Sequence, residues 1–170
     1  MDFAKLCKAR YSVRKFNPKP VEEEKLNAVL QAGISAPTAK NLQPQRLFLI
    51  TSPDGLQKAD ACMASHFAPP AIIMVAYDPK EAWVREEDGK NHGEIDATIA
   101  VTQMMLQAAE LGLGTTYVGM FSAEGLHKAF EELEGLVPTA MLPIGYPAED
   151  ARPSRLHENR KNLQEIAKRI

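Results

Sequence analysis

The stretch EIDATIAVTQMMLQAAELGL, residues 94–113, decides the fold, because its apolar residues recur every three or four positions over a long segment. That period predicts a helix about 30 Å long, enough to cross a small domain. The apolar residues fall into two stripes, so the helix should be buried on most of its sides. We therefore expect it in the central core or in a subunit interface. The two stripes are Ile95, Ile99, Leu106 and Leu113, and Ala100, Met104, Ala108 and Leu111.

Shorter helix and strand patterns surround this helix. Their order indicates an α+β or α/β fold with about four strands. So few strands would leave apolar surface of the long helix uncovered, and a homodimer would cover it. Residues 81–93, rich in charges and with two glycines, are expected to form a mobile loop or a short helix beside the site. The other expected elements are helices over 3–10, 22–35, 56–65 and 122–132, and strands over 46–51, 71–77, 115–119 and 139–146.

The composition is that of one globular domain spanning residues 1–170, with 45% hydrophobic and 25% charged residues. The longest apolar run, residues 68–77, has ten residues, whereas a membrane span needs about 20. Charged residues interrupt the N-terminus where a leader peptide would be apolar. We therefore expect a soluble, cytoplasmic protein that binds no membrane. Cys7 and Cys62 lack the spacing of a metal or redox motif and should be reduced core residues.

The net charge of −2 conceals an uneven distribution. Residues 1–20 carry a net +5 and residues 151–170 a net +4, whereas residues 21–150 carry −11. A nucleic-acid-binding protein would be basic overall, so this class is not expected. The distribution suits one compact anion, such as a phosphate, bound by both ends of the chain. The alternative is that the two ends are merely solubilising tails.

Several enzyme classes lack their characteristic motifs in this sequence. There is no P-loop, no dinucleotide fingerprint and no G-x-S-x-G. The four histidines lack metal-ligand spacing, so no metal site is expected. The sequence therefore lacks the residue patterns that hydrolase, kinase and deaminase chemistry requires. Asp96 either serves a site or, more simply, is a carboxylate at a helix start.

Four short blocks, spread over nearly the whole chain, carry a family resemblance. RYSVRKF, residues 10–16, resembles the R-x-S-x-R-x-F opening of the nitroreductase family of FMN-dependent flavoproteins. APTAKNLQP, residues 36–44, is similar to that family's A-P-S/T-x-x-N-x-Q-P loop. Residues 96–114 resemble its D-x-x-I-A helix ending in L-G-L-G, and LPIGYPAE, residues 142–149, resembles its late G-Y-P-A-E segment.

The resemblance implies a single FMN-binding domain with the α+β fold of this family. That fold is a three-layer sandwich, in which an antiparallel or mixed sheet of four to five strands has helices on both faces. The family forms an entwined homodimer with two FMN sites at the subunit interface.

One group of implied cofactor-binding residues comes from the two ends of the chain. By resemblance, Arg10 and Ser12 meet the phosphate and ribityl end of FMN, and Tyr11 lies between them. Arg14 would lie at the pyrimidine edge of the ring, where a positive charge favours the reduced flavin. A basic residue of the tail would also reach the phosphate, with Arg155 as first choice and Arg152 as second. Arginine suits this role because it binds phosphate with two parallel hydrogen bonds.

A second implied group comes from the middle of the chain. Pro37, Thr38 and Asn41, with Gln43 as a further contributor, would meet the flavin of the other subunit. The alternative is that residues 36–44 simply end the preceding helix. Val118 and Gly119 occupy the position whose backbone N–H points at flavin N5 in this family. No side chain is expected to act as a catalytic acid or base, because the flavin carries the chemistry.

The implied reaction is a ping-pong hydride transfer through flavin N5, from NADH or NADPH to an electron-poor acceptor. A nitroaromatic, a quinone or another flavin would serve as this small aromatic acceptor. Trp83, Met120 and Phe121 are candidates for the wall of its pocket, or else core residues. The alternative function is an FMN-binding, storage or sensor protein without efficient NAD(P)H turnover.

Overall fold

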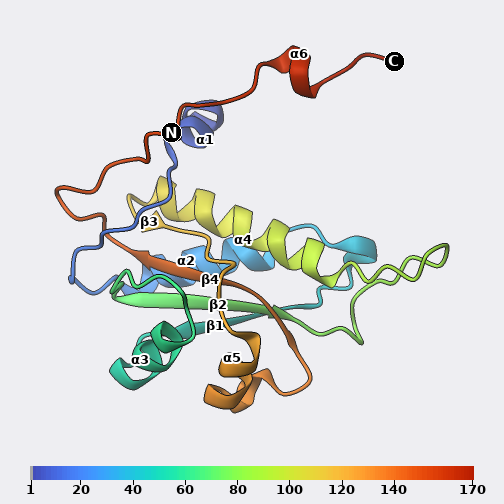
Figure 1. Cartoon of the computed structure of the whole chain (residues 1–170), viewed down its shortest axis with the longest axis horizontal. Helices are drawn as coiled ribbons and strands as arrows, with labels where there is room; N and C mark the ends of the chain where they lie inside the picture. Colours follow the sequence, from blue (N-terminus) through green and yellow to red (C-terminus); the bar gives the residue numbers. More distant parts are fainter. Residues whose placement is uncertain (1) are drawn as a thin grey trace.

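The middle layer of this computed structural model, which describes residues 2–170, is a four-stranded antiparallel sheet (Figure 1). Its strands lie in the order β1-β2-β4-β3, and each neighbouring pair is antiparallel. The run AIIMVAY of β2 is buried along almost its whole length, as expected for a strand covered on both faces. The strands are β1 (Gln45–Ile50), β2 (Ala71–Tyr77), β3 (Gly114–Thr115) and β4 (Val137–Gly145).

Helices cover both faces of this sheet. The helices α2 (Glu23–Ile34) and α4 (Gly93–Glu110) pack on one face, with Ile73 of β2 in their core cluster. The helices α3 (Pro53–Ala61) and α5 (Ala123–Ala129) pack on the other, with Ile72 in theirs (Figure 1). Adjacent residues of β2 thus enter opposite cores, as strand geometry requires. The predicted three-layer α+β sandwich is confirmed.

The ends of the chain lie outside the three layers. The short helix α1 (Phe3–Ala9) contacts α4, and the tail runs past α1 into α6 (Leu163–Ile166), away from the sheet (Figure 1). Two single turns of 3-10 helix complete the fold, η1 (Ala39–Asn41) and η2 (Glu131–Leu133). Within residues 2–170, no helix is both long and apolar enough to cross a bilayer.

The two stripes of α4 have different surroundings. Ala100, Met104 and Ala108 of one stripe are fully buried against the sheet and α2. Ile95 and Ile99 of the other stripe are 39% and 37% exposed. The helix is therefore central to the core and also leaves an apolar stripe on the surface.

Some elements differ from the sequence predictions. The helix predicted over 56–65 is α3, which begins three residues earlier because the hydroxyl of Ser52 caps it, accepting from the Gly55 amide. The strand predicted over 115–119 is only Gly114–Thr115, followed by an isolated bridge between Val118 and Met141.

Of two other predictions, the structure refines one and corrects the other. Residues 81–93 form a loop and not a helix, and a bridge between Val84 and Asn91 closes this loop into a hairpin with Arg85 paired to Asp88 near its tip. Cys7 is exposed, since only Leu6 of α1 is buried, whereas Cys62 is partly buried. Burial raises the pKa of the Cys62 thiol.

Candidate functional site

The two cationic ends of the chain meet beside β3 and the end of β4. The Val13 amide donates to the Thr115 carbonyl at 2.9 Å, and the Asn17 amide donates to the Tyr146 carbonyl at 2.8 Å. The Ala148 amide donates to the Lys15 carbonyl at 3.0 Å. Residues 12–17 are thereby joined to residues 145–150, the segment that leads directly into the cationic tail.

The tail then passes alongside the first helix. The rings of Tyr11 and His157 are 6.2 Å apart, edge to face. His157 Nε2 lies 3.1 Å from the Lys8 carbonyl oxygen, to which it donates. These contacts hold residues near Arg155 beside the segment that contains Arg10 and Ser12.

The four arginines of this region differ in what their guanidinium groups contact. Arg152 Nη1 donates to the carbonyls of Glu149 and Ala151, both at 2.8 Å, so it supports the backbone of the tail. Arg14 Nη1 donates to the Ser12 carbonyl at 3.1 Å. Arg10 and Arg155 have no side-chain hydrogen bond or ion pair within residues 2–170. This favours Arg155 over Arg152 as the tail residue available to an anion.

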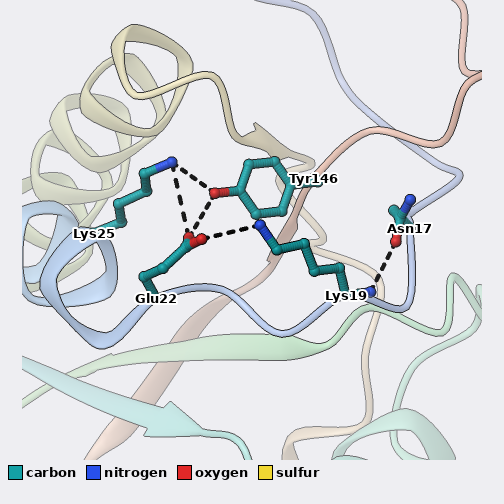
Figure 2. Close-up of polar contacts among 5 residues, drawn as sticks. All are labelled: Asn17, Lys19, Glu22, Lys25 and Tyr146. Atoms are coloured by element: carbon teal, nitrogen blue, oxygen red, sulfur yellow. Dashed lines mark hydrogen bonds and ion pairs between the residues drawn. The ribbon is translucent and has the colours of Figure 1, made fainter.

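A polar cluster anchors the start of the tail to α2 (Figure 2). Tyr146 Oη donates to Glu22 Oε2 at 2.5 Å and accepts from Lys25 Nζ at 2.6 Å. Lys19 Nζ donates to Glu22 Oε1 at 3.1 Å. The hydrogen bond from Tyr146 is the main reason that the pKa of Glu22 falls to about 2. The same tyrosine raises the pKa of Lys25.

The loop of residues 36–44 has an unusual backbone. Lys40, Asn41 and Gln43 have φ angles of 52°, 55° and 53°, in the left-handed region that favours glycine. Thr38 Oγ1 accepts from the Gln43 amide at 3.1 Å, which closes the loop. Pro37, Asn41 and Gln43 are exposed and Thr38 is half-buried. The loop therefore presents its predicted flavin contacts outward, away from its own subunit's core.

The loop of residues 36–44 and the segment of Arg10 and Tyr11 lie at opposite ends of α4, whereas Val118 bridges to Met141 of β4 on the other side of the sheet. The loop contacts the first turn, where Asp96 Oδ1 accepts from the Ala39 amide at 3.0 Å. Arg10 and Tyr11 instead line a cavity of about 150 Å³ with Ala109 and Gly114, beyond the last turn. Ala109 lies thirteen positions after Asp96 in the helix, which corresponds to a rise of about 20 Å along the helix axis. One protomer therefore does not bring the loop and Arg10 together.

The backbone donors at residues 118 and 119 are not equivalent. The Val118 amide donates to the Met141 carbonyl at 2.9 Å, so it is already used within the fold. The Gly119 amide has no partner within residues 2–170, and Gly119 is exposed. Gly119 alone is thus the free donor of this predicted pair.

The candidates for a pocket wall have different surroundings. Phe121 packs in the core cluster between the sheet and α3, whereas Met120 is 73% exposed. Trp83 lies 4.6 Å from the His92 ring, and Lys40 Nζ lies 5.6 Å from the Trp83 ring. Trp83 is thus beside the loop of residues 36–44.

Two contacts of this loop could not be predicted from the sequence. They are the hydrogen bond from the Ala39 amide to Asp96 and the contact of Lys40 with Trp83. Only the position of Asp96 at a helix start was visible in the sequence.

These donors fit the chemistry of FMN. The phosphate of FMN would need cations, and the unpaired guanidinium groups of Arg10 and Arg155 could supply them. The ring would need a hydrogen-bond donor near its reactive nitrogen, and the free Gly119 amide is a candidate for that donor. The exposed loop offers further contacts from the far end of α4.

Comparisons with known proteins agree with this fold. A nitroreductase family protein of Clostridium difficile 630 has a similar structure, with a TM-score of 0.92 and 37% identity over 99% of this chain and 98% of that one. A relative from Methanothermobacter thermautotrophicus is 28% identical over 92% of this chain and 86% of its own length. This relative has the provisional name NADH dehydrogenase/NAD(P)H nitroreductase.

A third protein, from Exiguobacterium sibiricum, shares the fold with a TM-score of 0.86 and 22% identity, over 100% of this chain and 98% of that one. It is provisionally termed a nitroreductase and was solved in complex with FMN. The model of the nitroreductase family matches residues 7–70 and 65–146 here, which include most of the predicted site. With the expected sandwich and the four sequence blocks in place, the chain belongs to the nitroreductase family.

Proposed function

We propose that this protein is an FMN-dependent NAD(P)H oxidoreductase that reduces electron-poor aromatic acceptors such as nitroaromatics and quinones. The observation that carries the proposal is the convergence of the two chain ends, which brings the unpaired Arg10 and Arg155 to one region. The FMN complex of the Exiguobacterium protein and the nitroreductase name of the Methanothermobacter relative support it.

The site we propose is built by two copies of the chain. The loop and Arg10 are about 20 Å apart along α4, so a second protomer must supply the loop. Two features support such a dimer: the exposed Ile95 and Ile99 on α4, and the exposed apolar tail residues Leu163 and Ile166. Exposed apolar side chains of this kind are common where subunits meet.

Each group of residues then has a distinct role. Arg10, Ser12 and Arg155 bind the phosphate and ribityl end, and Arg14 places a positive charge beside the ring. The Gly119 amide donates a hydrogen bond toward the ring. The partner's loop, through Pro37, Thr38, Asn41 and Gln43, orients the ring and excludes water. When bound, FMN supplies hydride transfer, and therefore no side chain need serve as acid or base.

The test is an anaerobic absorbance spectrum of the protein with FMN, recorded before and after NADH and then NADPH. We expect loss of the flavin band with at least one nucleotide and its return when a nitroaromatic or a quinone is added. A bound flavin that neither nucleotide bleaches would instead identify an FMN-binding protein without NAD(P)H turnover.

A further inference from the structure

The carboxyl group of Asp96 is buried in the first turn of α4, with only 2% of the residue exposed. Its Oδ1 accepts from the Ala39 amide at 3.0 Å. Its Oδ2 is enclosed and has no hydrogen-bond partner within residues 2–170. Burying a carboxylate with so few partners is costly. Stability alone therefore gives little reason for an aspartate here.

The loop depends on this contact. Thr38 is the N-cap of η1, but its side chain makes no capping hydrogen bond, because its hydroxyl accepts from Gln43 instead. The Ala39 amide finds its acceptor in a different element, α4. Lys40 and Asn41 follow directly in left-handed conformations. Such strained residues persist only where the surroundings fix them, and they concentrate at functional sites.

Favourable interaction with the helix dipole at the start of α4 does not by itself explain why Asp96 contacts the loop. Glu94 also lies in the first turn of α4, but it is exposed. A favourable interaction with the helix dipole would be available to both carboxylates. Only Asp96 reaches across to the loop.

We propose that Asp96 is a positioning residue for the flavin ring, acting through the Ala39 amide to fix the loop of residues 36–44 in its strained shape. The inference rests on the proposed function, because it takes this loop to meet the flavin held by the partner subunit. Asp96 does not touch the flavin. It determines where Pro37, Thr38 and Asn41 stand when the second protomer brings its flavin to them.

The test compares four single variants and one double variant by titrating FMN and riboflavin and following the quenching of flavin fluorescence. Asp96→Ala should raise the dissociation constants of both flavins by the same factor, about tenfold, because the loop meets the ring that they share. Asp96→Asn keeps an acceptor for Ala39 and should stay within about threefold of the unmodified protein. Glu94→Ala, the matched control, should bind both flavins normally.

The Ala39→Pro variant removes the same hydrogen bond from the loop side, because proline has no amide N–H to donate. It leaves the sequence of α4 unchanged. Thr38 is already extended, with φ −129° and ψ 158°, as a residue before proline must be. This variant should weaken flavin binding as Asp96→Ala does. The double variant should bind no more weakly than either single one, since both remove one interaction.

Hydrogen exchange of the flavin-free protein supplies a second readout. The amides of residues 39–43 should exchange faster in Asp96→Ala than in Glu94→Ala, with the core strands unchanged. Normal flavin binding by Asp96→Ala or Ala39→Pro would overturn the proposal, as would equal losses in the Asp96 and Glu94 variants. If the unmodified protein bound no flavin, the proposed function would fail as well, and the exchange data would still show whether Asp96 holds the loop.

Discussion

Arg10 and Arg155 are arginines whose guanidinium groups have no carboxylate partner within residues 2–170, in a chain whose middle is strongly acidic. Lys15 and Arg85, by contrast, are paired with Asp150 and Asp88. Two arginines brought together from the chain ends and free of carboxylate partners are suited to bind an anion, as the proposed phosphate site requires.

Replacing Arg10 by alanine should therefore weaken FMN binding selectively. Loss of a charged hydrogen bond costs about 1.5–3 kcal/mol, or roughly a 10- to 150-fold rise in the dissociation constant. Riboflavin, which has no phosphate, should bind equally to the variant and the unmodified protein. Fluorescence titration measures both, and Lys5→Ala, which removes a cation from α1, is the control. Equal FMN affinities for Arg10→Ala and Lys5→Ala would refute the assignment.

The cluster of Figure 2 should make stability depend on pH through Glu22. Its pKa is about 2 in the folded chain against an ordinary 4.5. The folded state thus favours the charged carboxylate, so the stabilisation is complete above about pH 4.5 and is lost as the pH falls towards 2.

Thermal unfolding of the Glu22→Gln variant and of the unmodified protein between pH 2 and pH 7 tests whether the Glu22 carboxylate makes stability depend on pH. The unmodified protein should be more stable than the variant above pH 5, and the difference should shrink between pH 4.5 and 2. Glu23→Gln is the neighbouring control. A difference that does not change with pH would show that the carboxylate charge has no part in the cluster.

Several of these residue contacts were beyond sequence reasoning for a physical reason. Tyr146 and Glu22 are 124 positions apart, and no local pattern brings them together. Asparagine adopts the left-handed conformation more readily than most residues, but nothing in the identity of Lys40 or Gln43 announced it. The charge of the chain ends, in contrast, was visible in the sequence and pointed to the same region that the fold assembles.

Among the elements, α4 depends most on close packing. Gly33 of α2 allows this packing, because a Cβ at that position would lie 2.9 Å from Met104 Sδ. Met104 itself is fully buried.

Met104→Ala should accordingly destabilise the protein by about 2–5 kcal/mol, through lost apolar burial and the cavity left behind. Met105→Ala, at the partly buried next position, should cost clearly less. Equilibrium denaturation in urea measures both. Equal losses would contradict the assignment of this stripe to the core.

Strands and helices were predicted well where the hydrophobic pattern was long. They were predicted less well where contacts between distant residues determine the local structure. The continuous run of β2 was predicted over the residues observed. The charged stretch 81–93 is a loop, as one alternative held, but the backbone hydrogen bonds that close it into a hairpin were not predicted. Cys7 followed an apolar pattern on α1, a helix that lies too far outside the layers to bury it.

For the whole molecule, the sandwich and the assignment of the loop to the other subunit's flavin were implied by the family resemblance, and the structure adds that the loop and Arg10 lie at opposite ends of α4. The divided site that we propose would require a dimer, because about 20 Å of α4 separates its two parts. Ile99→Glu tests this requirement, since Ile99 is 37% exposed in one chain and a charge there is compatible with the protomer fold.

The Ile99→Glu variant should be monomeric by analytical ultracentrifugation, keep a normal circular dichroism spectrum and lose FMN. A buried charge at the subunit interface would be strongly unfavourable, whereas the same charge in water is not. Stoichiometric FMN on the monomer would exclude the divided site.

The position of the loop and Arg10 at opposite ends of α4 has a genetic consequence. In a mixed dimer of an Arg10→Ala chain and a chain with a defective loop, one site carries both lesions and the other carries none. Random pairing of equal amounts would make half of the dimers mixed, so about a quarter of all sites would be intact. Two alleles that are each inactive alone should therefore complement each other when they are expressed in the same cell.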